Sequence, residues 1–229
     1  MSALRAFARG TWAVFRKDLV VERRAKEGAN ALAFFSILLL FLFYFALGPD
    51  RERIRTALPG LFWLAFLLAG LLALGRSFAL ERENDCLDAL VLAPGDKGGI
   101  YLGKVAGTTA LMLAMEGAFV VATGLLYNLD LWPAVPRLLV VAVFGTVGFA
   151  AVGTLFATMT AQLRAREVLL PVLLLPLVVP VLLAAVRLTE AALVGESWAT
   201  TAPWWRLLLG FDVVFIVAGL LTFEFVLEA

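Results

Sequence analysis

Long uncharged stretches separated by clusters of charged residues dominate the pattern of this chain. A helix crossing a hydrocarbon core of about 30 Å rises about 1.5 Å per residue, so each crossing needs about 20 mostly apolar residues. Backbone groups in lipid must be paired within the segment, so we expect these stretches to be helices. The uncharged runs predict six spans, at Leu32–Leu47, Thr56–Gly75, Val105–Leu129, Leu138–Leu163, Val168–Val186 and Leu207–Phe223.

The composition supports an integral membrane protein. Of the 229 residues, 62% are hydrophobic and 16% charged, whereas soluble domains are about 45–50% apolar and about 25% charged. We expect one permease domain over residues 1–229. The net charge of +1 gives no sign of a nucleic-acid partner.

The chain offers few ligands for metals or haem. It contains no histidine, and Cys86 is its only cysteine, so an internal disulfide is impossible. We therefore predict no directly bound metal. Methionine, Tyr101, Tyr127 or Cys86 could ligate iron in principle, but we expect them not to.

Lysine and arginine predict the orientation. They are more numerous in residues 1–28, 76–104 and 164–166 than in the connections on the other side, although Arg51, Arg53 and Arg55 weaken this bias. Positive residues favour the cytoplasm. Both termini are therefore predicted to be cytoplasmic, in a multi-pass protein of a bacterial cytoplasmic membrane.

Residues 1–28 are predicted to form a helix lying at the membrane surface. Trp12, Phe15 and Leu19 follow helical spacing, with Leu4 and Ala8 on the same side. Basic residues cover much of the rest, which suits contact with membrane lipids. The alternative is a charged lead-in that only enforces orientation.

A second cytoplasmic element is predicted within residues 76–104. Acidic residues open it at Glu81, its apolar side chains share one helical face, and Pro94 and Gly95 end it. Such a short amphipathic helix could dock in a groove of a separate protein. It could equally rest on the membrane surface, and the pattern does not decide between the two.

The stretch GGIYLGKV, residues 98–105, matches most of a phosphate-binding loop. Such a loop needs Ser or Thr after the lysine and a strand before it, but here Val105 follows and no strand is predicted. We therefore expect no ATP site in this chain. Instead Gly98 and Gly99 are expected to form a turn, Lys104 to reach lipid headgroups, and Gly103 with Gly107 to allow close helix packing.

These segments together resemble the haem exporter protein B family (CcmB), the permease subunits of the ABC-type complex in cytochrome c maturation. The resemblance rests on four stretches, in order along the chain: FRKDLVVERRAKE, PGLFWLAFLLAGLLALGRSFALERENDCLDALVLAP, IYLGKV and RAREVLLPVLLLPLVVPVL. The last carries three prolines, Pro171, Pro176 and Pro180, that resemble the proline-spaced fifth span of the family.

The resemblance implies a permease without a nucleotide site that works with a cytoplasmic ABC ATPase, which binds the ATP. It implies partnership with a haem-handling membrane protein and a small single-span protein, with ATP hydrolysis linked to release of a haem-loaded periplasmic chaperone. Haem is then handled by the complex. It also implies that an ATPase-coupling helix is formed by Glu83, Asp85, Leu87, Asp88 and Leu90. Trp204-Trp205-Arg206 lacks the aspartate of a haem-handling WWD motif and reads as an aromatic anchor at the membrane surface.

Two acidic residues interrupt predicted spans. Glu116 lies near the middle of the third span, where a charge costs about 2.5–3.5 kcal/mol on insertion scales. It could contact a translocation path or a partner helix, or be hydrogen-bonded within the bundle. Asp212 is expected nearer the membrane surface, in a solvated or paired position.

Prolines and glycines shape the last spans. The three prolines of the fifth span are interpreted as kinks with a static role rather than a relay. Gly145, Gly148 and Gly153 are expected to be packing positions.

The function predicted from the sequence is that of a non-enzymatic permease subunit, as a dimer with two ATPase copies. Two alternatives remain: an ABC-2 type exporter permease for a lipid, drug or polysaccharide, which shares the six-span layout, and a structural scaffold without an ATPase.

Overall fold

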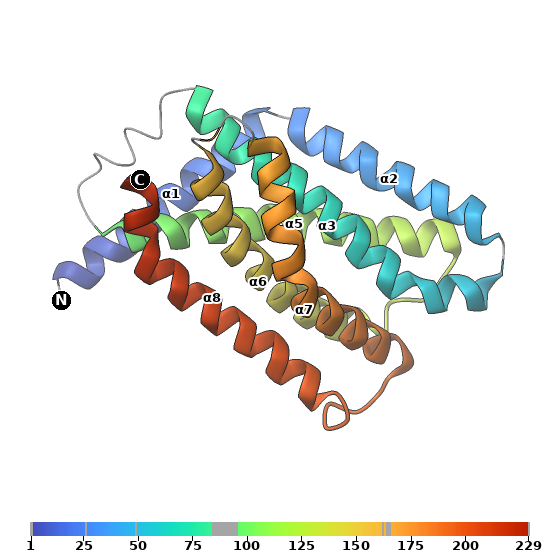
Figure 1. The fold of residues 1–229 in the computed structure, drawn as a ribbon. Helices are drawn as coiled ribbons and strands as arrows, with labels where there is room; N and C mark the ends of the chain where they lie inside the picture. Colours follow the sequence, from blue (N-terminus) through green and yellow to red (C-terminus); the bar gives the residue numbers. More distant parts are fainter. Residues whose placement is uncertain are drawn as a thin grey trace.

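The computed structural model of the protein describes residues 2–25, 27–48, 50–83, 96–161, 163 and 166–228. Within these ranges the chain is helical and no strand is present. The elements are α1 (Ser2–Ala25), α2 (Glu27–Leu47), α3 (Arg51–Glu83), α5 (Lys97–Tyr127), α6 (Val135–Ala161), α7 (Arg166–Val194) and α8 (Ala202–Glu228) (Figure 1).

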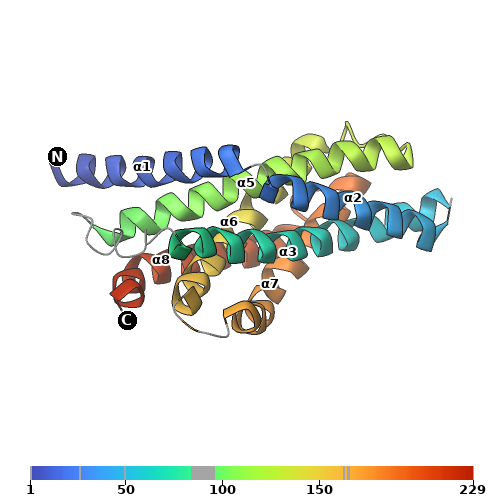
Figure 2. The same ribbon diagram turned by 90° about the horizontal axis from the view of Figure 1, so that it is seen from above.

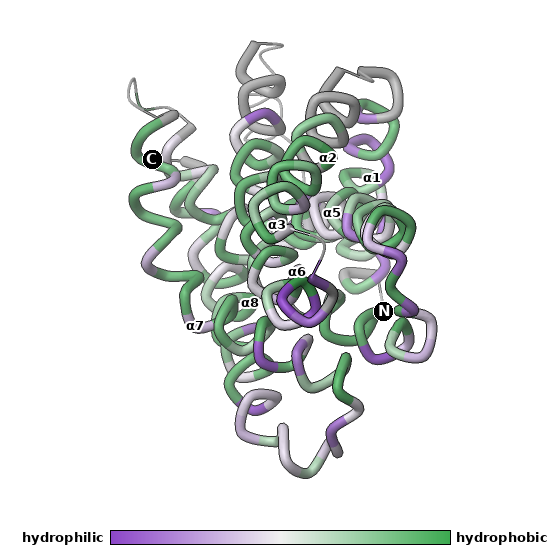
Figure 3. Tube along the Cα trace, turned by 90° about the vertical axis from the view of Figure 1, so that its right-hand side faces the viewer, coloured by the Kyte–Doolittle hydropathy of each residue, from purple (hydrophilic) through white to green (hydrophobic). Residues whose placement is uncertain are grey.

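Five helices are long and apolar enough to cross a membrane, counting only the described residues: α3, α5, α6, α7 and α8. They coincide with the five spans predicted from Thr56 onward, and apolar residues run along most of their length (Figure 3). In α2 the described residues include only a shorter apolar stretch, Ile37–Leu47. A sixth crossing at Leu32–Leu47 therefore stays a prediction.

Two boundaries differ from the expectation. Helix α3 continues to Glu83, so Glu81 lies in the last turn of this long helix and does not open a separate one. Helix α5 begins at Lys97, so Gly98 and Gly99 lie in its first turn and not in a connection. The Asp96 carboxylate caps this turn by accepting a hydrogen bond from the Gly98 N–H at 2.8 Å.

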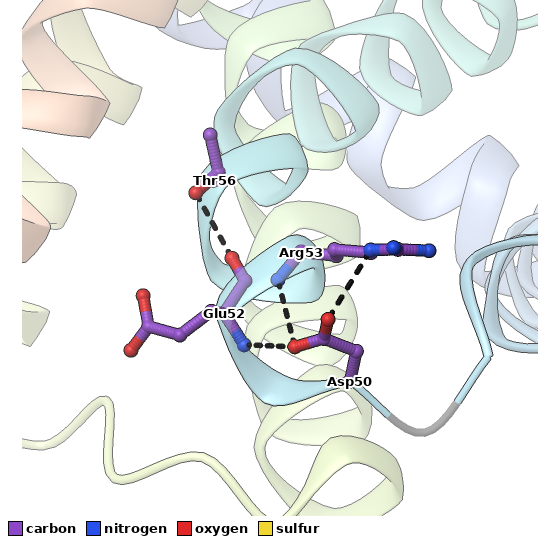
Figure 4. Close-up of polar contacts among 4 residues, drawn as sticks. All are labelled: Asp50, Glu52, Arg53 and Thr56. Carbon is purple, nitrogen blue, oxygen red and sulfur yellow. Dashed lines mark hydrogen bonds and ion pairs between the residues drawn. The ribbon is translucent and has the colours of Figure 1, made fainter.

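The start of α3 is fixed by one carboxylate (Figure 4). Asp50 Oδ1 accepts hydrogen bonds from the backbone N–H groups of Glu52, at 3.0 Å, and Arg53, at 3.4 Å. Asp50 Oδ2 also pairs with Arg53 Nε at 3.2 Å. These contacts satisfy helix donors that would otherwise have no partner, which explains why the helix begins immediately after the α2–α3 turn.

Helix α6 lies at the centre of the bundle and contacts α3, α5, α7 and α8. The predicted packing role of its glycines is confirmed. A methyl group on Gly145 would collide with the Trp63 ring, and one on Gly153 with the Leu74 side chain. Because glycine lets neighbouring side chains reach the helix backbone, α6 can be surrounded on several sides.

Helix α7 remains one helix from Arg166 to Val194 although it contains Pro171, Pro176 and Pro180. The largest apolar cluster joins it to α3, α6 and α8 through Leu174, Val178 and Val181, which are fully buried. Packing on this side stabilises the helix, although its prolines cannot donate backbone hydrogen bonds.

Both chain ends lie at the same end of the bundle (Figures 1 and 2). Helix α1 lies beside the first half of α5. The last turns of α8 also reach this place, where the rings of Phe223 and Tyr101 lie 5.4 Å apart. The beginning of α5 is therefore enclosed by the N-terminal and C-terminal helices.

Candidate functional site

The first half of α5 presents a glycine stripe that α1 covers. A methyl group on Gly103 would lie 2.7 Å from the Thr11 carbonyl oxygen and 2.7 Å from Val14 Cβ. On Gly99 it would lie 3.3 Å from the Phe7 carbonyl oxygen. The predicted close helix packing is thus confirmed, and the helix that approaches is α1.

Lys104 directly follows Gly103 and is buried, with 2% of its side chain exposed. Its ammonium lies 3.7 Å from Asp18 Oδ2 of α1, and Asp18 Oδ1 also pairs with Lys17 at 3.1 Å. The expectation that Lys104 reaches lipid headgroups was therefore wrong. The residue joins α5 to α1 because burial in the glycine contact gives it a carboxylate partner instead of water.

The face of α1 that packs against α5 was not predicted from the sequence. It consists of Phe7, Thr11, Val14 and Asp18, which follow one another at helical spacing. The apolar stripe that was noted instead lies to one side of it, where Leu4 is 78% and Trp12 63% exposed. This stripe remains available for the membrane surface, as predicted, while a mixed polar face holds the helix in place.

Glu116 lies buried at the level where α5 meets α6, with 6% of the residue exposed. The Thr146 hydroxyl of α6 donates a hydrogen bond to Glu116 Oε1 at 2.9 Å. The second oxygen, Oε2, is buried and has no hydrogen-bond partner among the described residues. Oε1 is therefore hydrogen-bonded within the bundle, as one of the two alternatives expected, whereas Oε2 has no partner among the described residues.

Glu116 also lines a cavity of about 510 Å³, here called the Glu116 cavity. It lies between α3, α5 and α6, with contributions from α7 and from the α5–α6 connection. Trp63 forms part of its wall and is fixed by a hydrogen bond from its Nε1 to the Thr189 hydroxyl at 2.9 Å. The lining also includes Gly117, Val121, Thr123, Leu125, Asn128, Trp132 and Leu139.

A second cavity of about 570 Å³ adjoins the first, with which it shares Leu58, Leu129, Leu131 and Leu193. Its lining includes Arg55, Asp130 and Arg137. Both arginines donate to backbone carbonyls near the α7–α8 connection: Arg55 to Leu193 at 3.1 Å, and Arg137 to Glu196 at 2.9 Å. The charged groups of this region thus lie outside the Glu116 cavity.

Asp212 of α8 does not occupy the predicted solvated position. It is 4% exposed, and neither carboxyl oxygen has a hydrogen-bond partner among the described residues. A methyl group on Gly148 would collide with it. Asp212 is buried because Gly148 leaves room for a carboxyl group against α6, which hydrophobicity counts cannot reveal.

The sequence model described as "CcmB protein" matches residues 9–227. The chain belongs to the CcmB protein family. It is 33% identical to the "Heme exporter protein B" of Pseudomonas aeruginosa over 186 residues, which are 79% of this chain and 80% of that protein.

Two further relatives of this CcmB-family chain carry the same name. The Bradyrhizobium diazoefficiens protein is 31% identical over 90% of this chain and 92% of its own length. The Rhodobacter capsulatus protein is 35% identical over 83% and 86%. The resemblance noted in the sequence is therefore confirmed over nearly the whole chain.

The described part of this CcmB-family chain contains no group of three or more His, Cys, Asp or Glu side chains that could hold a metal. The Tyr101 hydroxyl lies 3.1 Å from the carbonyl oxygens of both Ala151 and Phe215. The Tyr127 hydroxyl donates to the Leu40 carbonyl at 2.8 Å. Both tyrosines join helices, whereas Cys86 lies outside the described residues.

The predicted ATPase-coupling residues are not placed by the structure. Asp85, Leu87, Asp88 and Leu90 lie outside the described residues, as does the side chain of Glu83, with which α3 ends. The two flanking helices are described, however: α3 leads into this segment and α5 leaves it. The roles of the five ATPase-coupling residues therefore remain a prediction.

Proposed function

We propose that this chain is the membrane permease subunit of an ABC-type complex that exports or handles haem during cytochrome c maturation. The observation that carries the proposal is membership of the CcmB protein family over residues 9–227. The relatives are named heme exporters, and the apolar helices suit a multi-pass protein.

In this proposal ATP is bound by a separate ATPase subunit, so the permease is a transport subunit and not an enzyme. The stretch that resembles a phosphate loop supports this division, because residues 98–104 form part of α5. Its glycines contact α1 rather than forming a loop. A phosphate loop instead needs a glycine-rich turn between a strand and a helix, with its amides pointing at the phosphates.

Coupling is assigned to the segment between α3 and α5, with Glu83, Asp85, Leu87, Asp88 and Leu90 facing the ATPase. Movement there would pass directly into two long helices. Through the α1–α5 contact it would also reach the N-terminal helix. We propose that this movement accompanies release of the haem-loaded periplasmic chaperone by a haem-handling membrane protein.

The remaining parts of the proposed assembly are a permease dimer with two ATPase copies and a small single-span protein. Cytoplasmic placement of both termini is supported by their position at one end of the bundle (Figure 1) and by the basic residues of α1. The exposed Leu4 and Trp12 side chains of α1 suit the membrane surface.

The alternative is an ABC-2 type permease that exports another substrate. The Glu116 cavity supports this alternative, because a mostly apolar cavity of this size is typical of a small-molecule site. A scaffold without an ATPase is the third possibility, and it requires the predicted helix of residues 83–92 to have no partner.

The coupling assignment is tested by the double variant Asp85→Lys with Leu87→Asp, expressed with the partner subunits. We expect normal membrane insertion and loss of the coupling between ATP hydrolysis and chaperone release. Asp130→Lys, a charge reversal in the exposed α5–α6 connection, is the matched control and should leave coupling intact. Normal coupling in the double variant would contradict the assignment.

A further inference from the structure

Two polar residues that line the Glu116 cavity each have a buried oxygen without a hydrogen bond in the described part of the chain. These are Glu116 Oε2 and Thr123 Oγ1, in residues that are 6% and 1% exposed. A buried polar group without a partner costs about 1–3 kcal/mol. The two residues are seven positions apart on α5, so they share a face about 10 Å apart along the helix. Both belong to the cavity lining.

The rest of the lining suits the body of an apolar molecule. Leucine and valine side chains predominate, and the cavity follows α5 from Glu116 to Asn128, a length of about 18 Å. Val121, Leu125 and Leu139 line the cavity and are also exposed on the outside of the bundle. A molecule dissolved in the membrane could therefore enter from the side, between α5 and α6.

The ionisable group of the cavity selects the polar end of such a molecule. Among the described residues that line the cavity, Glu116 alone is ionisable. Neither Arg55 nor Arg137 belongs to it, and both donate to backbone carbonyls in the adjoining region. A carboxyl group without a basic neighbour disfavours an acidic ligand and favours one that donates hydrogen bonds or carries a positive charge.

We propose that the Glu116 cavity binds a lipophilic amine. Its amino group pairs with the Glu116 carboxyl group, which turns its second oxygen toward the ligand on binding, and its apolar chain lies along α5 toward Asn128. The site is distinct from the predicted ATPase-coupling segment, and the inference does not depend on the proposed function. It adds a ligand class to this chain that the names of its relatives do not mention.

Bromine quenching of tryptophan fluorescence provides the test, because Trp63 and Trp132 line the cavity. The full chain in phosphatidylcholine nanodiscs is titrated with bromododecylamine, bromododecanol and bromododecanoic acid. We expect saturable quenching by the amine, weaker binding of the alcohol and weakest binding of the acid. An acid that binds as tightly as the amine, or the absence of saturable quenching, would overturn the proposal.

Two pairs of variants locate the site. Glu116→Gln retains the size of the side chain and an acceptor for Thr146, and it should raise the amine Kd at least about tenfold, the loss expected for a charged hydrogen bond. Glu190→Gln, at an exposed residue paired with Arg187, should leave that Kd unchanged. Equal amine affinities of the wild type and Glu116→Gln would show that Glu116 does not bind the amine.

Gly117→Leu keeps the test decisive if Glu116→Gln does not insert. A methyl group on Gly117 meets nothing within 4 Å, and the residue lines the cavity, so leucine should fill it and abolish quenching by the amine. Gly60→Leu on α3 also projects into open space but lies outside the lining, so binding should persist. Binding that survives Gly117→Leu would contradict the proposed location.

Haemin serves as a fourth probe, because its carboxylates give it the opposite charge. The proposal expects it to bind this cavity more weakly than the amine. Haemin could instead bind more tightly than the amine, lose binding in Gly117→Leu and retain it in Glu116→Gln. That result would show that the cavity binds an acidic macrocycle rather than an amine.

Discussion

The two halves of α5 use the same small residue in opposite surroundings. In the first half, α1 lies so close to Gly103 that a methyl group would be 2.7 Å from a backbone oxygen. In the second half, a methyl group on Gly117 would meet nothing within 4 Å. The two buried charged residues also differ: Lys104 has the Asp18 carboxylate as its ion-pair partner, whereas Glu116 keeps one carboxyl oxygen without a hydrogen bond among the described residues.

Glycine therefore has two different structural roles in this membrane helix. Glycine allows a close approach, but only the presence of another helix makes the approach occur. Helix α1 supplies that neighbour for the first half of α5. In the second half the space remains open as the Glu116 cavity, which leaves room for a molecule that the chain itself does not provide.

The largest expected contrast comes from adding one methyl group to each half. Gly103→Ala should lower the free energy of unfolding by about 1–3 kcal/mol, because the backbone of α1 must move. Gly117→Ala should raise it by about 0.5–1 kcal/mol, because alanine favours a helix and nothing is displaced. Unfolding in detergent measures both. Effects of the same sign and size would contradict the comparison.

A smaller effect is expected from Lys104→Met. It removes the ammonium that faces the partly buried Asp18, and we expect a loss of about 1–3 kcal/mol, the cost of leaving a buried polar group without its partner. Adding Asp18→Asn should recover part of the loss, because no carboxylate is then left without its buried partner.

The matched control for Lys104→Met is Arg187→Met, since Arg187 pairs with Glu190 on the surface, where both side chains are about half exposed. That change should matter by less than about 0.5 kcal/mol. Equal losses in the two variants, followed by thermal unfolding, would show that the α1–α5 ion pair contributes no more than a surface pair.

The smallest effect concerns the hydrogen bond that holds one side of Glu116. Thr146→Val retains the shape of the side chain and removes the donor, so we expect a loss of about 1 kcal/mol in unfolding free energy. Thr222→Val, at an exposed threonine that donates within its own helix, should be neutral. A neutral Thr146→Val would mean that Glu116 gains nothing from α6.

Much of the helical framework could be predicted from the sequence. Five apolar runs coincide with long helices, because length and hydrophobicity decide membrane crossing. The packing roles of Gly103, Gly145 and Gly153 are also confirmed. These features depend on local sequence, namely on a run of apolar residues or on the lack of a side chain.

What the sequence missed depends on which helices become neighbours. Lys104 was assigned to headgroups because its span gives no sign of Asp18, which lies in another helix. Asp212 was placed near the surface because nothing in its own segment indicates the space left by Gly148. Thr123 could have been noticed, since it follows Glu116 by two helical turns, but the cavity between them requires α3 and α6.

Purification of the full chain from its native membrane in a gentle detergent, with mass spectrometry of the proteins that accompany it, tests the proposed function most directly. The account predicts an ABC ATPase together with a haem-handling membrane protein. An ATPase alone would favour the exporter of another substrate. A chain that purifies without any ATPase would contradict the assignment of this protein as the permease of a haem-export complex.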